Sequence, residues 1–242
     1  MTLISLSILE YEKSLLKNMD NLVNSEAFLN ILKILRSKKV HCIHIDVMRP
    51  PMVPKIKFPL ALIKKLYEML HDKVVLSIHL MTEDPLKIVE ELNEFIPENK
   101  RNNIAVIVQV EAFNTEDEAL EALEALKRFH YRTGICLNLP TSEERLTDKI
   151  AEAADIILLM SVPMGAGGQR YREEATQRIR RFSQKFPNKI IEVDGGINPE
   201  TIVKAQEAGA KIAVVGSYIT TSENPEKALL ELEKALVHKR SQ

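Results

Sequence analysis

Short apolar runs alternate with longer amphipathic stretches along this chain of 242 residues, and this alternation limits the folds open to it. Eight runs rich in Ile, Val and Leu span residues 3–9, 40–47, 74–80, 103–111, 133–139, 155–162, 189–194 and 211–216. Nearly continuous hydrophobicity over so short a length is typical of strands that are covered on both faces, as in parallel sheets. Eight such strands separated by helices predict an α/β fold of the (β/α)8 TIM-barrel type, with an open doubly wound sheet as the alternative.

Helical patterns fill the segments between these strands. They are clearest at residues 59–71, 115–130, 198–210 and 222–240. Thr115 and Asn198 stand where N-caps are expected, and Pro199 and Gly209 stand just inside the start and just past the end of one pattern. We find no change in composition and no Ser/Gly-rich linker, so we expect residues 1–242 to form a single barrel domain.

Charge and cysteine content exclude several classes of protein. The 33 Lys and Arg are balanced by 34 Asp and Glu, which argues against a nucleic-acid binder. No apolar run approaches the roughly 18 residues of a membrane span, and the N-terminal segment lacks the basic region of a signal peptide. Cys42 and Cys136 both lie in strand-like runs, where we expect buried free thiols. These features favour a cytoplasmic protein without membrane or nucleic-acid partners.

Polar residues at the ends of the predicted strands mark the candidate site, because TIM-barrel active sites lie at the carboxyl ends of the strands. His44 and Asp46 are two residues apart and therefore point the same way, into the barrel mouth. His79 and Asp194 end two other strands. Taken singly, each has a simpler interpretation, as a hydrogen-bonded core histidine or a turn-forming aspartate. Together, two imidazoles and two carboxylates at one place predict a divalent-metal site.

Glycine-bearing segments follow the last three strands. They read "GAGGQ" at 165–169, "DGGIN" at 194–198 and "VGSYI" at 215–219. Glycines let backbone N–H groups approach a ligand closely, and the loops after strands seven and eight of this fold commonly hold a phosphate. A flexible surface loop is the alternative interpretation for the first segment. The three together predict a phosphorylated ligand.

The motifs "SIL", "HIDVM", "HLM", "MSV", "GAGGQ", "VDGGIN" and "VVGS" occur in the order and spacing of ribulose-phosphate 3-epimerases, and the chain resembles that family over essentially its whole length. The resemblance implies that His44, Asp46, His79 and Asp194 are metal ligands, and that Asp46 and Asp194 are also the two acid/base residues. It also implies a set of methionines crowding the site, Met48, Met81 and Met160. The substrate-binding residues it implies are Ser7, His79, Gly165, Ala166, Gly167, Gly168, Gly195, Gly196, Gly216 and Ser217.

The activity that this resemblance implies is a metal-dependent epimerisation at C3 of a ketose phosphate. The default reaction converts D-ribulose 5-phosphate to D-xylulose 5-phosphate by two-Asp proton transfer through a metal-stabilised enediolate. The cofactor is one divalent ion, and the mixed ligand set allows Zn, Fe, Mn or Co. The resemblance also implies a homo-oligomer.

Several positions depart from the family pattern around the barrel mouth. Arg49 and Pro50 stand where the family has an acidic residue and a glycine, Ser77 replaces a carboxylate, and Gln109 replaces a histidine, although Glu111 remains. Met52 and Ala166 replace aromatic residues. These changes keep open a ketohexose-phosphate epimerase, for example of allulose 6-phosphate, or a sugar-phosphate binder without turnover. They also leave open whether Arg49 makes the mouth less negative or only points to solvent. A decarboxylase of the orotidine-phosphate type would need an Asp-x-Lys-x-x-Asp array, which the sequence lacks.

Overall fold

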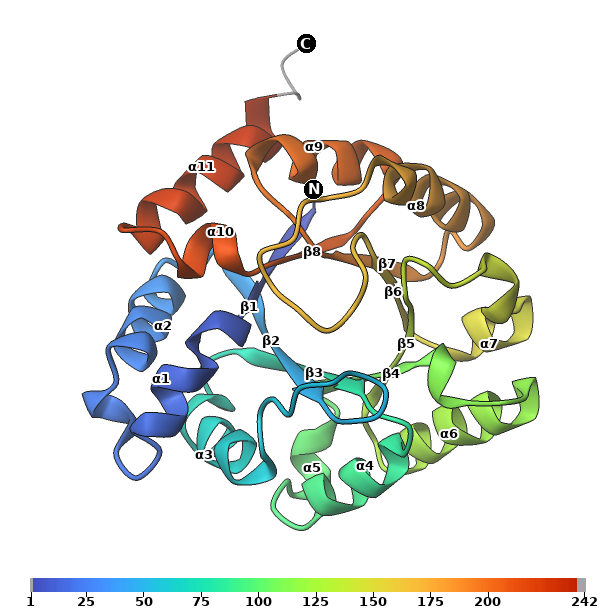
Figure 1. Ribbon diagram of the computed structural model, residues 1–242, viewed down its shortest axis with the longest axis horizontal. Coiled ribbons are helices and arrows are strands. Elements are labelled where there is room, and N and C mark those ends of the chain that lie inside the picture. Colours follow the sequence, from blue (N-terminus) through green and yellow to red (C-terminus); the bar gives the residue numbers. More distant parts are fainter. Residues whose placement is uncertain (1, 239–242) are drawn as a thin grey trace.

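The eight apolar runs form strands that pair in parallel around a closed barrel (Figure 1). The structure is a computed structural model, and it describes residues 2–238. The strands are β1 Leu3–Ser7, β2 Val40–Met48, β3 Val75–Met81, β4 Ile104–Gln109, β5 Arg132–Leu137, β6 Ile156–Met160, β7 Ile190–Asp194 and β8 Ile212–Val215. Pairing between β1 and β8 closes the ring. The predicted (β/α)8 barrel is therefore confirmed, and the open doubly wound sheet is excluded.

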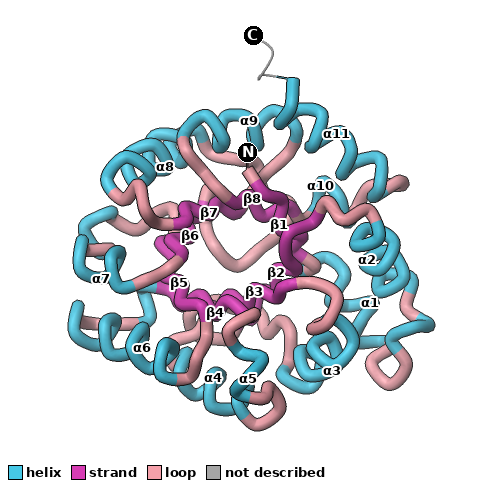
Figure 2. The backbone as a smooth tube through the Cα atoms, turned by 180° about the vertical axis from the view of Figure 1, so that it is seen from behind, coloured by secondary structure: helices cyan, strands magenta, loops and turns pink. Residues whose placement is uncertain are grey.

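Helices connect the strands and form a ring around the outside of the barrel (Figure 2). The α-helices are α1 Glu12–Lys17, α2 Glu26–Arg36, α3 Leu60–Leu70, α4 Pro85–Asn93, α5 Glu98–Arg101, α6 Glu116–Arg128, α7 Asp148–Ala153, α8 Glu173–Lys185, α9 Pro199–Ala208, α10 Ser217–Thr220 and α11 Pro225–His238. Short 3-10 turns are η1 Leu9–Tyr11, η2 Leu22–Asn24, η3 Val110–Ala112 and η4 Glu143–Arg145. The Thr115 and Asn198 side chains cap α6 and α9 as predicted. Residues 239 and 240 of the helix expected over 222–240 lie outside the described residues.

Side chains alternate between two environments along each strand, and this alternation places the site. On β2, Ile43, Ile45 and Val47 pack outward against the helices in the main apolar core. The intervening His44 and Asp46 are buried as well, at 0% and 2% exposed, on the other face of the strand. On β3 and β7, too, outward-facing apolar side chains alternate with polar side chains on the other face. The polar side chains of β2, β3 and β7 therefore face the barrel interior, which β4, β5 and β6 fill with apolar residues such as Ile107 and Leu158. The main apolar core lies between the barrel and its helices.

Loops at the carboxyl ends of the strands cover the barrel mouth. The longest of them joins β6 to α8 and crosses the opening (Figure 1). The strand expected over 103–111 ends at Gln109 instead, because residues 110–112 turn into η3.

Within the described residues, no helix has both the length and the apolar character needed to cross a membrane.

Candidate active site

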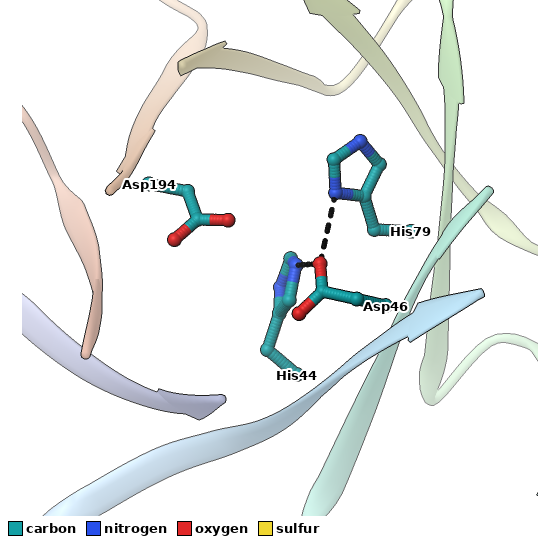
Figure 3. A group of neighbouring side chains, drawn as sticks. All are labelled: His44, Asp46, His79 and Asp194. Atoms are coloured by element: carbon teal, nitrogen blue, oxygen red, sulfur yellow. Dashed lines mark hydrogen bonds and ion pairs between the residues drawn. The ribbon is translucent and has the colours of Figure 1, made fainter. Parts of the chain in front are cut away.

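Four side chains that can bind a metal converge at the carboxyl ends of three strands (Figure 3). His44 and Asp46 come from β2, His79 from β3 and Asp194 from β7. One ligand atom from each residue can be chosen so that all of these atoms lie within 4.8 Å of one another. The two imidazoles are fully buried, whereas Asp194 is partly exposed. The convergence predicted from strand alternation is thus present in the structure.

Asp46 is the centre of this cluster, because both of its oxygens have partners. Oδ1 lies 3.2 Å from His44 Nε2 and 3.3 Å from His79 Nδ1 (Figure 3). Oδ2 accepts a hydrogen bond of 3.0 Å from the Ser7 hydroxyl. The pairing of β2 with β3 places Asp46 directly beside His79, so the register of these two strands assembles three of the four residues.

Burial and charge shift the pKa values of the two carboxyls in opposite directions. Burial alone would raise the pKa of Asp46, but the attraction and hydrogen bonding of His44 and His79 outweigh it and hold that pKa well below its usual range. The pKa of Asp194 rises to about 7, first because of burial and then because of the negative charge of Asp46. Asp46 is therefore ionised at neutral pH, whereas Asp194 exchanges its proton near neutral pH.

The carboxylate of Asp46 also shifts the pKa values of the two imidazoles. Burial lowers the pKa of both rings, and for His79 this effect prevails. For His44 burial is again the largest single effect, but the charge and hydrogen bonding of Asp46, together with Glu192 and Asp194, outweigh it and raise the pKa well above its usual value. Both ring nitrogens of His44 lack a hydrogen bond of standard geometry within residues 2–238. Buried ring nitrogens that face carboxylates without a hydrogen bond of standard geometry, together with a mixed imidazole and carboxylate donor set, fit a divalent metal ion such as Zn, Fe, Mn or Co.

A pocket opens above the cluster and contains most of the predicted substrate-binding residues. Its wall holds Met48, Met81 and Met160, the three methionines expected there. The predicted residues that line it are Ser7, Gly165, Ala166, Gly167, Gly168, Gly195, Gly196, Gly216 and Ser217. His79 lies among the carboxylates and does not line the pocket, so its contact with substrate stays a prediction. The charged residues in this lining are acidic, namely Glu10, Asp46 and Asp194.

The glycine loops adopt backbone conformations that other residues rarely reach. Gly195 and Gly196 have φ values of +120° and +63° directly after β7, and Gly165 and Gly168 have φ values of +106° and +71° in the β6–α8 loop. Ser217 begins α10, the short helix that follows β8. Backbone groups rather than basic side chains therefore line the part of the pocket where a phosphate was predicted.

The sequence interpretation missed three polar residues at the site. Glu10 lies in η1 beyond the end of β1, and its carboxylate lies against Gly167. Glu192 is buried one layer below Asp194, with its Oε1 3.5 Å from His44 Nδ1. Gln109, which departs from the family pattern at the end of the fourth strand, hydrogen-bonds to His79, a contact that the sequence did not predict. The period-two alternation of β7 could have revealed Glu192, because it places that residue on the same face as Asp194.

Arg49 does not line the pocket in the described structure. Its guanidinium folds back and donates to three backbone carbonyls, at 2.7 Å to Met48, 2.5 Å to Lys57 and 3.0 Å to Phe58. Nearby, the buried Glu12 carboxylate accepts from Lys57 Nζ and from the backbone N–H of Phe58. Neither of the two interpretations from sequence holds, since this side chain neither enters the mouth nor points freely to solvent. It ties the β2–α3 loop together.

Comparison with known proteins places the chain among epimerases. The model of the ribulose-phosphate 3 epimerase family matches residues 23–220. The chain is 30% identical to the cytoplasmic isoform of ribulose-phosphate 3-epimerase from Oryza sativa subsp. japonica over 196 residues, which is 80% of this chain and 82% of that protein. It is also 30% identical to the ribulose-phosphate 3-epimerase of Helicobacter pylori strain J99 over 214 residues, covering 86% of this chain and 93% of the relative.

Solved structures agree on the fold at much lower identity. KGPDC from Streptococcus mutans superposes with a TM-score of 0.66 at 11% identity, covering 99% of this chain and 98% of the other. A 3-hexulose-6-phosphate synthase superposes with a TM-score of 0.62 at 16% identity, covering 97% and 99%. At such identities these likenesses concern the barrel alone.

Proposed function

The chain belongs to the ribulose-phosphate 3-epimerase family, and we propose that it interconverts D-ribulose 5-phosphate and D-xylulose 5-phosphate with a divalent metal ion at His44, Asp46, His79 and Asp194. Its relatives are isomerases that act on a carbohydrate phosphate, and the chain is an enzyme of this class.

One observation supports the proposal above all others. The four metal-binding side chains lie below a pocket whose wall is formed largely by glycine-rich loops and methionines. A ketose phosphate has two unlike ends, a polar carbonyl and hydroxyl end and a phosphate end. The carboxylates and imidazoles suit the first end, and the loops at Gly195, Gly196, Gly216 and Ser217 suit the second. This division of one pocket matches the two ends of the proposed substrate.

Epimerisation at C3 needs one group that removes a proton and another that returns a proton to the opposite face. Asp46 and Asp194 come from strands on different sides of the barrel. They are the two carboxyls that belong both to the metal-binding cluster and to the pocket lining. The two imidazoles keep Asp46 ionised, so its carboxylate is in the deprotonated form that a base requires. Asp194, whose pKa is raised, is ready to donate one. Opposite pKa shifts in two neighbouring carboxyls are the arrangement that such a reaction requires.

A bound divalent cation supplies Lewis-acid stabilisation of the negative charge that develops on the substrate oxygens. The protein contributes orientation and exclusion of water. Met48, Met81 and Met160 form an apolar wall next to the carboxylates, which limits protonation of the intermediate by solvent. Binding of the phosphate by the backbone of the glycine loops provides binding energy away from the reacting carbon. The homo-oligomeric state and the cytoplasmic location stay predictions.

The decisive experiment follows the reaction in D2O. Purified protein loaded in turn with Zn, Fe, Mn or Co receives D-ribulose 5-phosphate, and NMR detects D-xylulose 5-phosphate and deuterium at C3. We expect both products with at least one metal. Asp194→Asn is expected to reduce exchange by about 10²-fold or more, the usual contribution of a general acid/base residue. Asp148→Asn, a charge removal at an exposed position on α7, serves as the matched control and is expected to keep the wild-type rate.

Two results would contradict the proposal. Saturable binding of the ketose phosphate without deuterium incorporation would indicate a binding protein without turnover. A much higher kcat/KM for allulose 6-phosphate than for ribulose 5-phosphate would move the assignment to a ketohexose phosphate.

A further inference from the structure

The two imidazoles of the cluster are connected in the same way, each between Asp46 and a second buried polar side chain. His44 directs Nε2 to Asp46 and Nδ1 to Glu192, at 3.2 and 3.5 Å. His79 directs Nδ1 to Asp46 Oδ1 at 3.3 Å, and its Nε2 lies 2.8 Å from Nε2 of Gln109. Gln109 ends β4, the strand beside β3, and is fully buried. The proposed reaction gives Gln109 no role.

The contact between Gln109 and His79 determines where the imidazole carries its proton. A short contact between two nitrogens needs one N–H donor and one lone pair. The Asp46 carboxylate only accepts, so the neutral ring carries its proton on Nδ1 and offers a lone pair at Nε2. The amide of Gln109 therefore donates to Nε2 through its NH2 group. In this arrangement Gln109 Oε1 is buried without a hydrogen-bond partner among the described residues, which is an unfavourable state for an amide oxygen.

Metal binding requires the other tautomer of His79, with the proton on Nε2. A histidine binds a metal through the lone pair of a nitrogen, and the nitrogen of His79 that faces the cluster is Nδ1. The ring proton must then lie on Nε2 and needs an acceptor there. Half a turn of the Gln109 amide brings Oε1 to this place, since the oxygen and the NH2 group of an amide have nearly the same size. The thiol of Cys136, which also contacts Gln109, is both a weak donor and a weak acceptor and accommodates either orientation.

We propose that Gln109 is a positioning residue whose amide rotates when metal binds and thereby selects the tautomer of His79. The proton leaves Nδ1 to solvent, and Nε2 takes one from solvent, so the ring keeps one proton and a neutral charge in both states. Because an amide can donate or accept without ionising, Gln109 serves both states at no cost in charge. This inference rests on the metal centre proposed above.

Nitrogen NMR of the full chain tests the inference directly. Histidine is labelled with 15N, and the signals of His79 are assigned by their loss in His79→Asn. We expect His79 to carry its proton on Nδ1 in the metal-free protein and on Nε2 after loading with Zn2+, which is diamagnetic. The same Nε2–H tautomer in both states would overturn the switch while leaving the metal centre intact. Wild-type protein that binds no divalent metal would overturn both.

Zinc affinity, measured by competition with a chelator, tests the role of the side chain. Gln109→Met keeps the shape but has no hydrogen-bonding group, and we expect it to bind zinc about 10- to 100-fold more weakly, as is usual when the outer partner of a metal-binding histidine is lost. Gln109→Glu keeps an acceptor for Nε2–H and is expected to bind at least as tightly as wild type. Thr133→Val changes a buried side chain on the neighbouring β5 and removes its hydrogen bond to the exposed Asp155, away from the imidazoles, and is the matched control for lost packing.

Wild-type affinity in Gln109→Met would overturn the proposal. Equal weakening in Gln109→Met and Gln109→Glu would also overturn it, because loss of shape rather than loss of an acceptor would then explain the effect. The NMR measurement uses wild-type protein and decides the question even if a variant does not fold.

Discussion

The role of Arg49 could not be inferred from its neighbours in the sequence. This residue follows directly after the strand that carries His44 and Asp46, at a position where an opposite charge was expected. A guanidinium has five N–H donors and a flexible stem, so it can reach several carbonyls at once. The carbonyls of Met48, Lys57 and Phe58 lie at the two ends of the β2–α3 loop, and all three accept from Arg49. Those of Met48 and Lys57 also accept a backbone N–H from each other. The positive charge consequently stabilises the loop and does not line the pocket.

We expect Arg49→Met to lower the free energy of unfolding by about 2 kcal/mol, because several hydrogen bonds from a charged donor are lost at a partly buried position. Because Arg49 does not line the pocket, the KM for the ketose phosphate is expected to change less than about threefold. Urea unfolding and steady-state kinetics measure the two effects. Arg170→Met is the control for stability, since the described residues give Arg170 no hydrogen bond or ion pair and it is exposed. A tenfold rise in KM with unchanged stability would instead make Arg49 a substrate-facing residue.

The sequence predicted the four residues of the metal-binding cluster and missed Glu10, Glu192 and the partner of Gln109, although strand alternation places Glu192 on the same face as Asp194. His44, Asp46, His79 and Asp194 follow from period-two alternation and from the meeting of strand ends in a barrel. Glu10 lies in a 3-10 turn, where that alternation no longer applies. The partner of Gln109 depends on the register of β3 with β4, which one sequence without a structure does not contain.

At the scale of elements, the glycine loops differ in how much room surrounds them. Gly196 packs against the backbone of the β6–α8 loop, and a Cβ added to it would lie 2.2 Å from the nitrogen of Tyr171. Gly168 has a similar positive φ, but nothing lies within 4 Å of its added Cβ. The two loops are therefore held together at Gly196 by direct contact of one main chain with another. This contact connects the loop after β7 to the loop that crosses the barrel mouth.

Alanine at these two positions separates backbone strain from packing. Both substitutions force a left-handed conformation, which costs about 1–2 kcal/mol. Gly196→Ala also displaces the backbone of Tyr171, so we expect it to cost clearly more stability than Gly168→Ala and to raise the KM for the phosphorylated substrate at least tenfold. Thermal unfolding and kinetics of the two variants side by side measure this difference. Equal effects of both substitutions would mean that the contact between the loops contributes nothing to the pocket.

Element boundaries were predicted less well than element types. Each predicted strand formed, yet the first, fourth, fifth and sixth ended two residues early. The fourth ends where η3 begins. Apolar residues continue past its end because Val110 is buried among the helices, and burial alone does not distinguish a strand from a tight turn. The capping residues Thr115 and Asn198 were more informative, since a side chain that accepts from the first turn fixes where a helix begins.

At the scale of the whole molecule, barrel closure produces the site. Asp46 and Asp194 belong to β2 and β7, which do not pair with each other, and only the pairing of β8 with β1 brings the two ends of the sheet together. A closed ring has no edge strand from which it could open step by step. We therefore expect the chain to unfold as one cooperative unit, in keeping with the single domain expected over residues 1–242.

The two cysteines test this expectation, because Cys42 lies on β2 and Cys136 on β5, in different parts of the ring, and both are buried. If the barrel opens only as a whole, both thiols react with an alkylating reagent at the same rate under conditions where reclosing outpaces labelling. The dependence of both rates on urea is then that of global unfolding. Mass spectrometry of Cys42→Ala and Cys136→Ala assigns each rate to one thiol. Faster labelling of one cysteine, with a weaker dependence on urea, would mean that part of the barrel opens by itself and that the chain contains more than one cooperative unit.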